Sequence, residues 1–528
     1  MKKRDYSDED ENGTTAVRIN CERRPAWAMC VLLAAATSCS RSTPGPSTRD
    51  AGQHTLAITH VTVIDMTGAP PKPAMTVVVS GDRITAIGRS DSLSPPAGAV
   101  LVDGTGKYVI PGLWDMHVHS AFDRYERSIV LPLDIANGVT GVRDMWGDCS
   151  GPCADKDTVY NPLHGPTPEM VHRWEREIAA GTLLGPRIVA ASNLLDGPHP
   201  FWAGSVAIHD TAEARAAVRD AQRRGADFIK VYSGLSREAY LAIADEAKRR
   251  GMPFAGHVPD AVSLEDAADA GQLSMEHLIK MPEACSSRPA DVARLTKRNA
   301  DHPPTSPSEG AAQIRAKVTL LNESFNLAAC APLLERFVHD GTWQVPTLTV
   351  LRGLYCGQDY ACTHDPRREY VARADTAWWQ ARDRQLAPVF TAADKRTAKT
   401  YFQHEIQIVG AMHRAGVGVL AGTDVSNPWV YWGSSLHDEL AMFVDAGFTP
   451  FAALQAATIA PARFLHATDT LGTLEPGKVA DLVVLDADPL ADIHNTQRIS
   501  AIVLRGRLVD SAARQRLLDA ARSAAQRM

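Results

Sequence analysis

Several features that would assign a chain to a common class are missing from this sequence. It has no basic block that would favour nucleic acid and no acidic tail, and its net charge of −6 is small for 528 residues. No CxxC pair indicates a zinc ribbon. The apolar run over residues 26–36 is too short to cross a bilayer as a helix. The remaining composition, 45% hydrophobic and 22% charged, is that of a globular protein with a large core.

The amino-terminal segment has the pattern of a leader for export. Arg23 and Arg24 precede the apolar run 26–36, small residues follow, and a stretch rich in Ser, Thr and Pro continues after Cys39. A basic flank, a short apolar segment and small residues are typical of a secretory signal. We therefore expect residues 1–53 to be a signal or lipoprotein-type leader with a linker. Cys39 is the candidate for a lipid anchor, and the mature protein is expected in the periplasm or anchored to a membrane. The alternative is a disordered, mildly apolar tail.

The cysteines that follow this leader agree with export. They are an even set of six, with two close pairs, Cys149 with Cys153 and Cys356 with Cys362, and the distant pair Cys285 and Cys330. In an oxidising compartment the close pairs could form disulfides, and the distant pair would then join across an insertion. The alternative is a set of free thiols.

Both ends of the chain after the leader are rich in short β-strands. Runs of β-branched residues separated by turn residues predict strands at 60–64, 75–79 and 83–87 near one end. The same pattern recurs at 480–485, 499–504 and 508–509 near the other end. We expect one small composite β-sandwich, formed by residues 54–108 and 470–515.

The middle of the chain alternates strands with helices. Strands are expected at 185–190, 228–231, 254–257, 274–277, 343–348 and 417–422. Helices are expected at 211–224, with Thr211 as the N-cap, at 237–250, and from the cap Ser263 to residue 270. Repeated βα units imply a parallel sheet, and their number favours a closed (β/α)₈ barrel over residues 109–469. The α/β fold class is therefore expected to combine this TIM-type barrel with the β-sandwich.

Two irregular segments interrupt the alternation, at residues 282–341 and 353–398. Both follow strand ends, where insertions in a barrel lie over the mouth that carries the active site. They are therefore candidate lids, and the alternative is surface decoration.

The most specific motif is the His-x-His pair of His117 and His119. Histidines at i and i+2 on a strand point to the same face, so both imidazoles would face the barrel axis at the end of the first strand. Such a pair alone is weak evidence. Here four further residues end later strands in order, and barrel enzymes place their sites at such strand ends. These residues are Lys230, His257, His277 and Asp424.

With these motifs the chain closely resembles the amidohydrolase superfamily, in its imidazolonepropionase-like and prolidase-like branch. The resemblance covers about residues 55–509 and includes the segments 138–144, 185–188 and 474–482. It implies a (β/α)₈ barrel, a composite sandwich and two divalent metal ions. The metals are expected to be zinc, although His and carboxylate ligands also suit cobalt, manganese or iron.

The resemblance also assigns roles to the motif residues. His117, His119 and Asp424 would bind the more buried metal, and His257 and His277 the more exposed one. Lys230 would be carbamylated by CO₂ and bridge both ions, since a free ammonium group cannot ligate a cation. A bridging hydroxide would attack the substrate, with Asp424 as the catalytic residue that accepts its proton and passes it to the leaving group.

Weaker candidates surround this set. Tyr232 shares the strand face of Lys230, and the resemblance implies that it binds substrate or the developing oxyanion; otherwise it packs in the barrel. His199, in a loop after an early strand, is a second candidate for the substrate pocket. Arg143 is expected to anchor the second barrel strand internally. His404 and His413 lie in a helical stretch and are interpreted as structural.

The expected activity is hydrolysis of an amide C–N bond in a small substrate, such as a dipeptide or an N-acyl amino acid. One alternative keeps the site and changes the bond to a lactone or a phosphotriester. Another is a non-catalytic exported binding lipoprotein, which the complete ligand set disfavours. The remaining alternatives are a cyclic-amide hydrolase and a deaminase, and deaminases of this superfamily usually bind one metal and lack the bridging lysine. No nucleic-acid partner is expected, and the sequence leaves the oligomeric state open.

Overall fold

The computed structural model describes residues 55–121, 123–145, 166–202, 204–356, 364–386 and 391–528. The chain divides into two units, Met1–Gly52 and Gln53–Met528, and the following description concerns the second. The expected leader with Cys39, and the pairings of Cys149 with Cys153 and Cys356 with Cys362, lie outside the described part. Within that part, no helix combines the length and apolar character needed to span a membrane. The expected sandwich and barrel boundaries stay a prediction.

Strands from both ends of this unit form one mixed sheet. Its order is β16-β15-β14-β5-β1-β2-β3, and β4 pairs with β1. A bridge between Arg83 and Val479 brings the edge strand β3 back to the segment before β14, so the sheet folds over itself. The core inside it consists of aliphatic residues such as Ile58, Val77 and Val503, because alternate residues of each strand face inward. The strands are β1 (Thr55–Val63), β2 (Lys72–Ser80), β3 (Arg83–Arg89), β4 (Val100–Asp103), β5 (Tyr108–Pro111), β14 (Leu482–Leu485), β15 (Ile499–Leu504) and β16 (Arg507–Val509).

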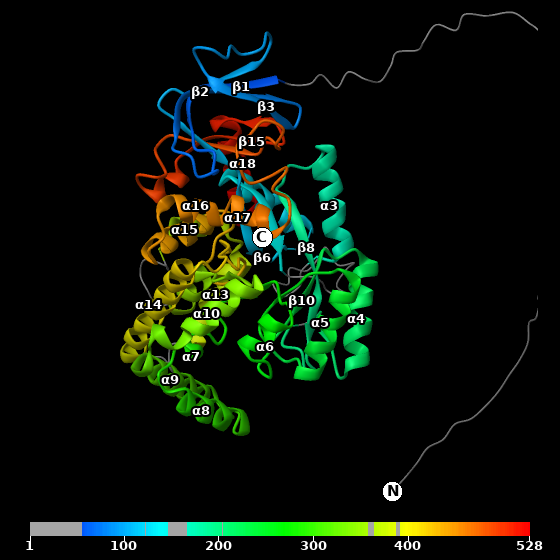
Figure 1. Cartoon of the computed structure of the whole chain (residues 1–528), viewed down its shortest axis with the longest axis vertical. Coiled ribbons are helices and arrows are strands. Elements are labelled where there is room, and N and C mark those ends of the chain that lie inside the picture. Colours follow the sequence, from blue (N-terminus) through cyan, green and yellow to red (C-terminus); the bar gives the residue numbers. More distant parts are fainter. Residues whose placement is uncertain (1–54, 122, 146–165, 203, 357–363, 387–390) are drawn as a thin grey trace, which may run out of the picture. The chain divides into compact units, whose positions relative to one another are not determined.

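A second sheet contains the barrel strands, all parallel, in the order β13-β12-β11-β10-β8-β7-β6, with β9 beside β8. Figure 1 labels β6, β8 and β10 of this sheet. A strand was expected at 417–422, but the structure has no regular strand there. Residues 418–425 instead bridge β13 through Gln344–Val419 and β6 through Val118–Val425, which closes the ring. The strands are β6 (Leu113–Val118), β7 (Val139–Asp144), β8 (Arg187–Asp196), β9 (Val206–Ala207), β10 (Phe228–Val231), β11 (Phe254–Gly256), β12 (Ser274–Glu276) and β13 (Trp343–Val345).

Helices between these strands form the outer layer of the barrel. The expected helices form with the expected ends, although Asp210 caps α4 in place of Thr211, accepting hydrogen bonds from the Ala212 and Glu213 amides. Ser236 and Ser263 cap α5 and α6 in the same way. The helices up to this point are α1 (Asp123–Tyr125), the π-helical turn η1 (Glu126–Val130), α2 (Leu131–Ala136), α3 (Pro168–Ala180), α4 (Thr211–Arg224), α5 (Arg237–Arg250) and α6 (Leu264–Asp269).

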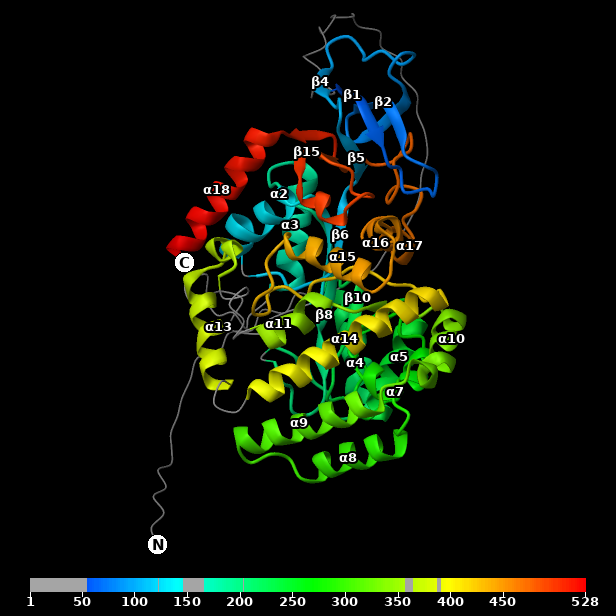
Figure 2. The same ribbon diagram turned by 90° about the vertical axis from the view of Figure 1, so that its left-hand side faces the viewer.

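The two expected insertions are helical where the structure describes them. In the first, Cys285 and Cys330 form a disulfide, as expected, which ties its entry to a point near its end. Figure 2 shows α8 and α9 of this insertion side by side, with α9 packed against α14. The elements are α7 (Met281–Ala284), α8 (Pro289–Asp301), α9 (Pro307–Ser324), η2 (Leu327–Cys330), α10 (Ala331–Asp340), α11 (Leu348–Cys356), η3 (Pro366–Tyr370), α13 (Arg373–Leu386) and α14 (Ala392–Ala415).

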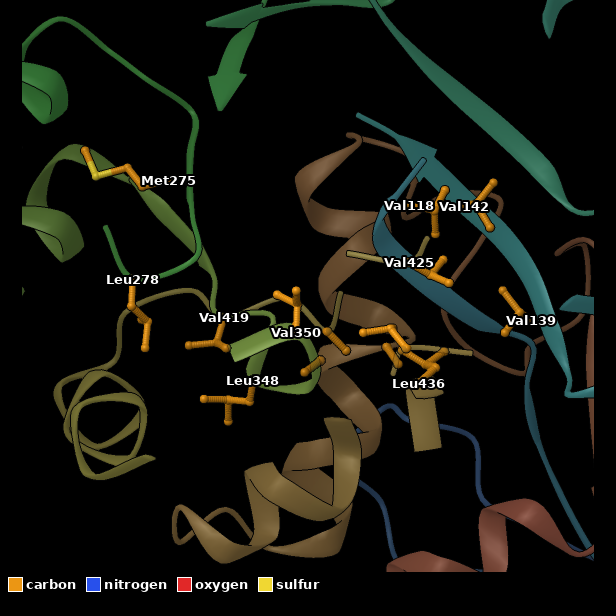
Figure 3. Close-up of a cluster of buried hydrophobic side chains, with 14 of the residues drawn as sticks. Val118, Val139, Val142, Met275, Leu278, Leu348, Val350, Val419, Val425 and Leu436 are labelled. Carbon is orange, nitrogen blue, oxygen red and sulfur yellow. The ribbon is translucent and has the colours of Figure 1, made fainter. Parts of the chain in front are cut away.

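The main core lies between the barrel strands and the surrounding helices. Val118 on β6 and Val425 on the closing segment meet there, and Val142 on β7 lies beside them (Figure 3). A helix not foreseen from the sequence, α18, packs against α2 and η1. The remaining elements are α15 (Ser435–Asp445), α16 (Pro450–Ala456), α17 (Ile459–Phe464), η4 (Ile493–Gln497) and α18 (Ser511–Arg527).

Candidate metal centre

The His-x-His pair meets Asp424 at the carboxyl end of β6. His119 Nε2 lies 2.6 Å from Asp424 Oδ1, and His117 Nε2 lies 3.3 Å from the same oxygen. His117 is fully buried, whereas the side chain of His119 is 16% exposed. The two imidazoles and the carboxylate therefore converge, with one partly open side.

The backbone places Asp424 against this strand end. Its amide donates to the His117 carbonyl at 2.7 Å, and its φ of 58° lies in the left-handed region. His277 also has a positive φ, 62°. Non-glycine residues in this region carry strain and cluster at functional sites. Gly422 allows the close approach, since a Cβ there would lie 2.9 Å from His117 Cβ.

His277 completes a group with the donor set of a metal site. Candidate ligand atoms of His117, His277 and Asp424 all lie within 4.8 Å of one another. The His117 and His277 ring centroids are 4.5 Å apart, and His277 Nδ1 lies 3.7 Å from Asp424 Oδ2. Two neutral imidazoles and a carboxylate suit Zn²⁺ and similar divalent ions.

The outer nitrogens of three histidines are held by other side chains. His117 Nδ1 lies 2.8 Å from Glu276 Oε2, His277 Nδ1 lies 2.8 Å from the Thr347 hydroxyl, and His257 Nδ1 lies 2.9 Å from the Ser233 hydroxyl. These contacts leave Nε2 of each ring for ligation, as second-shell partners do in metal sites. Buried His117 Nε2 has no hydrogen-bond partner among the described residues. The residues therefore fit a bound metal.

His257 lies next to this group and stacks on Tyr232. Its ring centroid is 4.9 Å from that of His277 and 4.0 Å from that of Tyr232. The Tyr232 hydroxyl accepts a hydrogen bond of 2.8 Å from Trp202 Nε1. Burial raises the pKa of Tyr232 to about 12, so the hydroxyl stays protonated at neutral pH. Tyr232 thus presents a fixed phenol beside a predicted ligand.

Lys230 is buried at the end of β10, near the carboxylate of Asp424. Burial lowers its pKa to about 8, against the opposing charges of Glu276 and Asp424. Gly256 on the adjacent strand allows this packing, because a Cβ there would lie 3.1 Å from Lys230 Cδ and 2.3 Å from the Val231 carbonyl oxygen. A lysine with a lowered pKa supplies the neutral amine that reacts with CO₂.

The electrostatics favour neutral imidazoles around an ionised carboxylate. Burial lowers the pKa of His277 to about 3 and that of His257 well below its usual value. Burial would raise the pKa of Asp424, but the neighbouring imidazoles of His277 and His117 outweigh it and hold this pKa well below its ordinary range. Metal ligation requires these protonation states.

Beneath the histidines lies a buried ion pair that sequence reasoning did not assign. Arg143 Nη2 lies 3.0 Å from both carboxylate oxygens of Glu276, and Arg143 also donates to Ser274 Oγ and to the Met116 carbonyl. Arg143 was expected to anchor β7, and it does so by reaching to β6 and β12. Glu276 directly precedes the predicted ligand His277, and this position was the only sequence signal that Glu276 belongs to the site.

The other predicted residues are placed differently. His199 is exposed in the loop after β8, and the described structure records no contact between it and the metal-site residues. His404 stacks on Phe325 and His413 on Phe448, in agreement with structural roles. Asp115, two residues before His117, was not predicted as a site residue, yet its carboxylate accepts hydrogen bonds from the amide and hydroxyl of Thr423 and so fixes the residue before Asp424.

Comparison with known proteins supports this description. Residues 344–509 match the model of the amidohydrolase family, and none of the curated proteins matches the chain. Bottromycin amidohydrolase is 24% identical, with 89% of this chain and 90% of that chain covered and a TM-score of 0.67. A protein assigned as a prolidase from Bifidobacterium longum is 24% identical, covering 89% and 99%, with a TM-score of 0.57. A Xaa-Pro dipeptidase is 20% identical, covering 87% and 100%, with a TM-score of 0.58.

These three structures are less than 25% identical to the chain, and their similarity establishes a shared fold. The family model covers the part of the chain that carries Asp424 and the strands β14, β15 and β16 of the mixed sheet. Residues 344–509 thus match the amidohydrolase family, and the barrel with its histidine-bearing strand ends shares its fold with structures such as bottromycin amidohydrolase.

Proposed function

We propose that this enzyme cleaves an amide C–N bond in a small substrate, such as a dipeptide or an N-acyl amino acid, with two divalent metal ions at the mouth of the barrel. The observation that carries this proposal is the convergence of His117, His277 and Asp424 within 4.8 Å. His119, His257 and Lys230 adjoin that group, so a six-ligand set is available. Zinc is the proposed metal, and CO₂ would modify Lys230 as a carbamate.

The chain's own residues account for proton transfer and orientation. When bound, divalent ions in such a site lower the pKa of water and polarise a carbonyl group. Asp424, kept ionised by its surroundings, would accept the proton of the attacking water and deliver it to the leaving amine. The Tyr232 hydroxyl, positioned by Trp202, would donate a hydrogen bond to the substrate oxygen.

The substrate class is supported by the names of similar structures. They include a Xaa-Pro dipeptidase with bound methionine, bottromycin amidohydrolase and phenylurea hydrolase B. These names describe the similar proteins themselves, and together they favour an amide-type bond as the target of this chain. His199 remains a candidate for the substrate pocket only as a residue of the exposed loop after β8.

We also propose that the enzyme is exported, to the periplasm or to a membrane through a lipid on Cys39. The Cys285–Cys330 disulfide supports this proposal, because disulfides persist in oxidising compartments. The test is globomycin-sensitive labelling of the full chain with a fatty acid. Loss of labelling in Cys39→Ser is expected, and an unlabelled wild-type chain would contradict the anchor.

The proposed reaction is tested by metal analysis followed by a substrate panel. The full chain, purified without chelator, should contain about two transition-metal ions and hydrolyse dipeptides or N-acyl amino acids. Asp424→Asn should lose nearly all turnover, whereas Asp469→Asn, at an exposed position, should keep it. Turnover of lactones or phosphotriesters alone would overturn the assigned bond. Absence of metal after reconstitution with zinc and bicarbonate would overturn the metal mechanism.

A further inference from the structure

The end of the barrel opposite the candidate metal centre contains a cavity of about 640 Å³. Trp114, Arg187 and Phe228 line it from the first two residues of β6, β8 and β10, whereas the predicted metal ligands lie at the carboxyl ends of the strands. None of the six predicted ligands lines the cavity. It is therefore separate from the candidate metal centre.

The wall of this cavity is mainly apolar. Phe464, Leu465 and Leu471, from the end of α17 and the segment after it, face the strand residues Ile188 and Phe228. The roof includes Arg143, whose guanidinium lies 5.1 Å from the Phe464 ring centroid. All three donor groups of Arg143 are already bonded to the β6 and β12 residues described above, so this arginine closes the cavity and has no nitrogen to spare for an occupant.

The cationic residue left for an occupant is Arg505. Its Nε is buried without a hydrogen-bond partner, and its guanidinium forms no salt bridge among the residues that the structure describes. The neighbouring acids are engaged elsewhere. Asp481 pairs with Arg187 at 3.3 Å and accepts the Arg505 backbone amide, and Glu175 lies 2.6 Å from His172 Nδ1. Arg505 is half-buried, and its buried Nε without an acceptor carries a cost that an anion would relieve.

We propose that this cavity binds a small amphipathic monoanion, with an aromatic or branched apolar body and a carboxylate or sulfonate group held by Arg505. The apolar wall would take the body of the ligand, and the unpaired guanidinium would orient its acidic group. The site is independent of the proposed hydrolysis, because binding there requires neither the metal ligands nor turnover.

The experiment uses the metal-loaded full chain and the fluorescent aromatic sulfonate 8-anilinonaphthalene-1-sulfonate. We expect saturable binding with one probe per chain. Arg505→Met keeps the apolar stem and removes the charge, so it should weaken binding about tenfold, the loss that one charge-assisted hydrogen bond predicts. Leu471→Trp should fill the cavity and weaken binding at least as much. Arg463→Met, at an exposed position on α17, is the matched control and should bind the probe like the wild type.

The uncharged probe N-phenyl-1-naphthylamine separates the two halves of the proposal. It should bind more weakly than the sulfonate, and Arg505→Met should leave its affinity unchanged. Equal affinity of both probes for the wild type would overturn the anion site. Absence of saturable sulfonate binding, or binding that neither Arg505→Met nor Leu471→Trp weakens, would overturn the cavity assignment. If Leu471→Trp does not fold, as judged by circular dichroism, Arg505→Met with the two probes decides.

Discussion

Arg143 and Glu276, which are 133 residues apart in the sequence, form a buried pair in which one guanidinium nitrogen lies 3.0 Å from both carboxylate oxygens. Glu276 Oε2 also lies 2.8 Å from His117 Nδ1. The pair therefore links the barrel interior to a predicted metal ligand. Breaking a buried pair leaves one charge without compensation, and loss of a second-shell partner weakens metal binding.

We expect Glu276→Gln to destabilise the protein by about 3 kcal/mol and to weaken metal binding about 10- to 100-fold. The amide keeps the shape of the side chain but cannot neutralise Arg143. Thermal unfolding and competition with a metal chelator measure the two effects. Glu335→Gln, at an exposed position on α10, is the control. Wild-type metal affinity in Glu276→Gln would show that the pair does not act on the site.

Removal of Lys230 tests the bridging ligand. Lys230→Ala should lose metal as well as activity, because a carbamate on Lys230 would supply an anionic ligand to the metal ions. Metal content by plasma mass spectrometry is the direct measurement, and Lys248→Ala, at an exposed position on α5, is the control. If Lys230→Ala retains both metals and the full rate, the carbamate assignment is wrong.

The hydrogen bond from Trp202 to Tyr232 should matter for turnover. Tyr232→Phe is expected to lower kcat/KM about 10- to 100-fold, through loss of a donor to the substrate oxygen. Trp202→Phe should have a smaller effect, about threefold to tenfold, since it only releases the phenol. Tyr240→Phe removes a buried phenol that donates to Gln272 and should leave kcat/KM unchanged. Equal rates for Tyr232→Phe and wild type would exclude a catalytic role for the hydroxyl.

Glu405 on α14 predicts a pH-dependent loss of stability. Burial, with repulsion from Glu283, raises its pKa from 4.5 to about 8. Folding therefore favours the protonated form of Glu405. The contribution of this group to the free energy of unfolding is fully present below about pH 4.5 and is lost as the pH rises through about 8. Glu405→Gln should raise the Tm relative to wild type at pH 9 and change it little at pH 5. Glu335→Gln should show no such trend, and a constant difference for Glu405→Gln would contradict the pKa shift.

The disulfide between Cys285 and Cys330 should stabilise the first insertion. It closes a loop with a sequence separation of 45, for which the chain-entropy account gives about 4 kcal/mol. Both cysteines are buried, so strong reductant with heating is needed to open the bond. Reductant should lower the Tm of the wild type but not that of Cys285→Ser/Cys330→Ser. An identical response of the two proteins would contradict a structural role.

The class of fold and the candidate ligands could be predicted from the amino-acid pattern. Alternation of strands and helices is a local pattern, and the spacing of His117 and His119 places both rings on one strand face. Strand ends of a parallel barrel converge at one mouth, so the positions of Lys230, His257, His277 and Asp424 were predictable. Segment 417–422 was assigned to the barrel, although its lack of regular strand structure was not foreseen.

The groups that surround those ligands could not be predicted from the amino-acid pattern. Glu276 and Thr347 hold the outer nitrogens of His117 and His277, and Arg143 crosses the barrel to reach Glu276. The position of Arg505 at the opposite end of the barrel, with its Nε unpartnered among the described residues, likewise cannot be read from the order of residues along the chain. These contacts join residues that are distant in sequence, and their geometry depends on how strands and helices pack. Local periodicity carries no information about such pairings, so the fold alone establishes them.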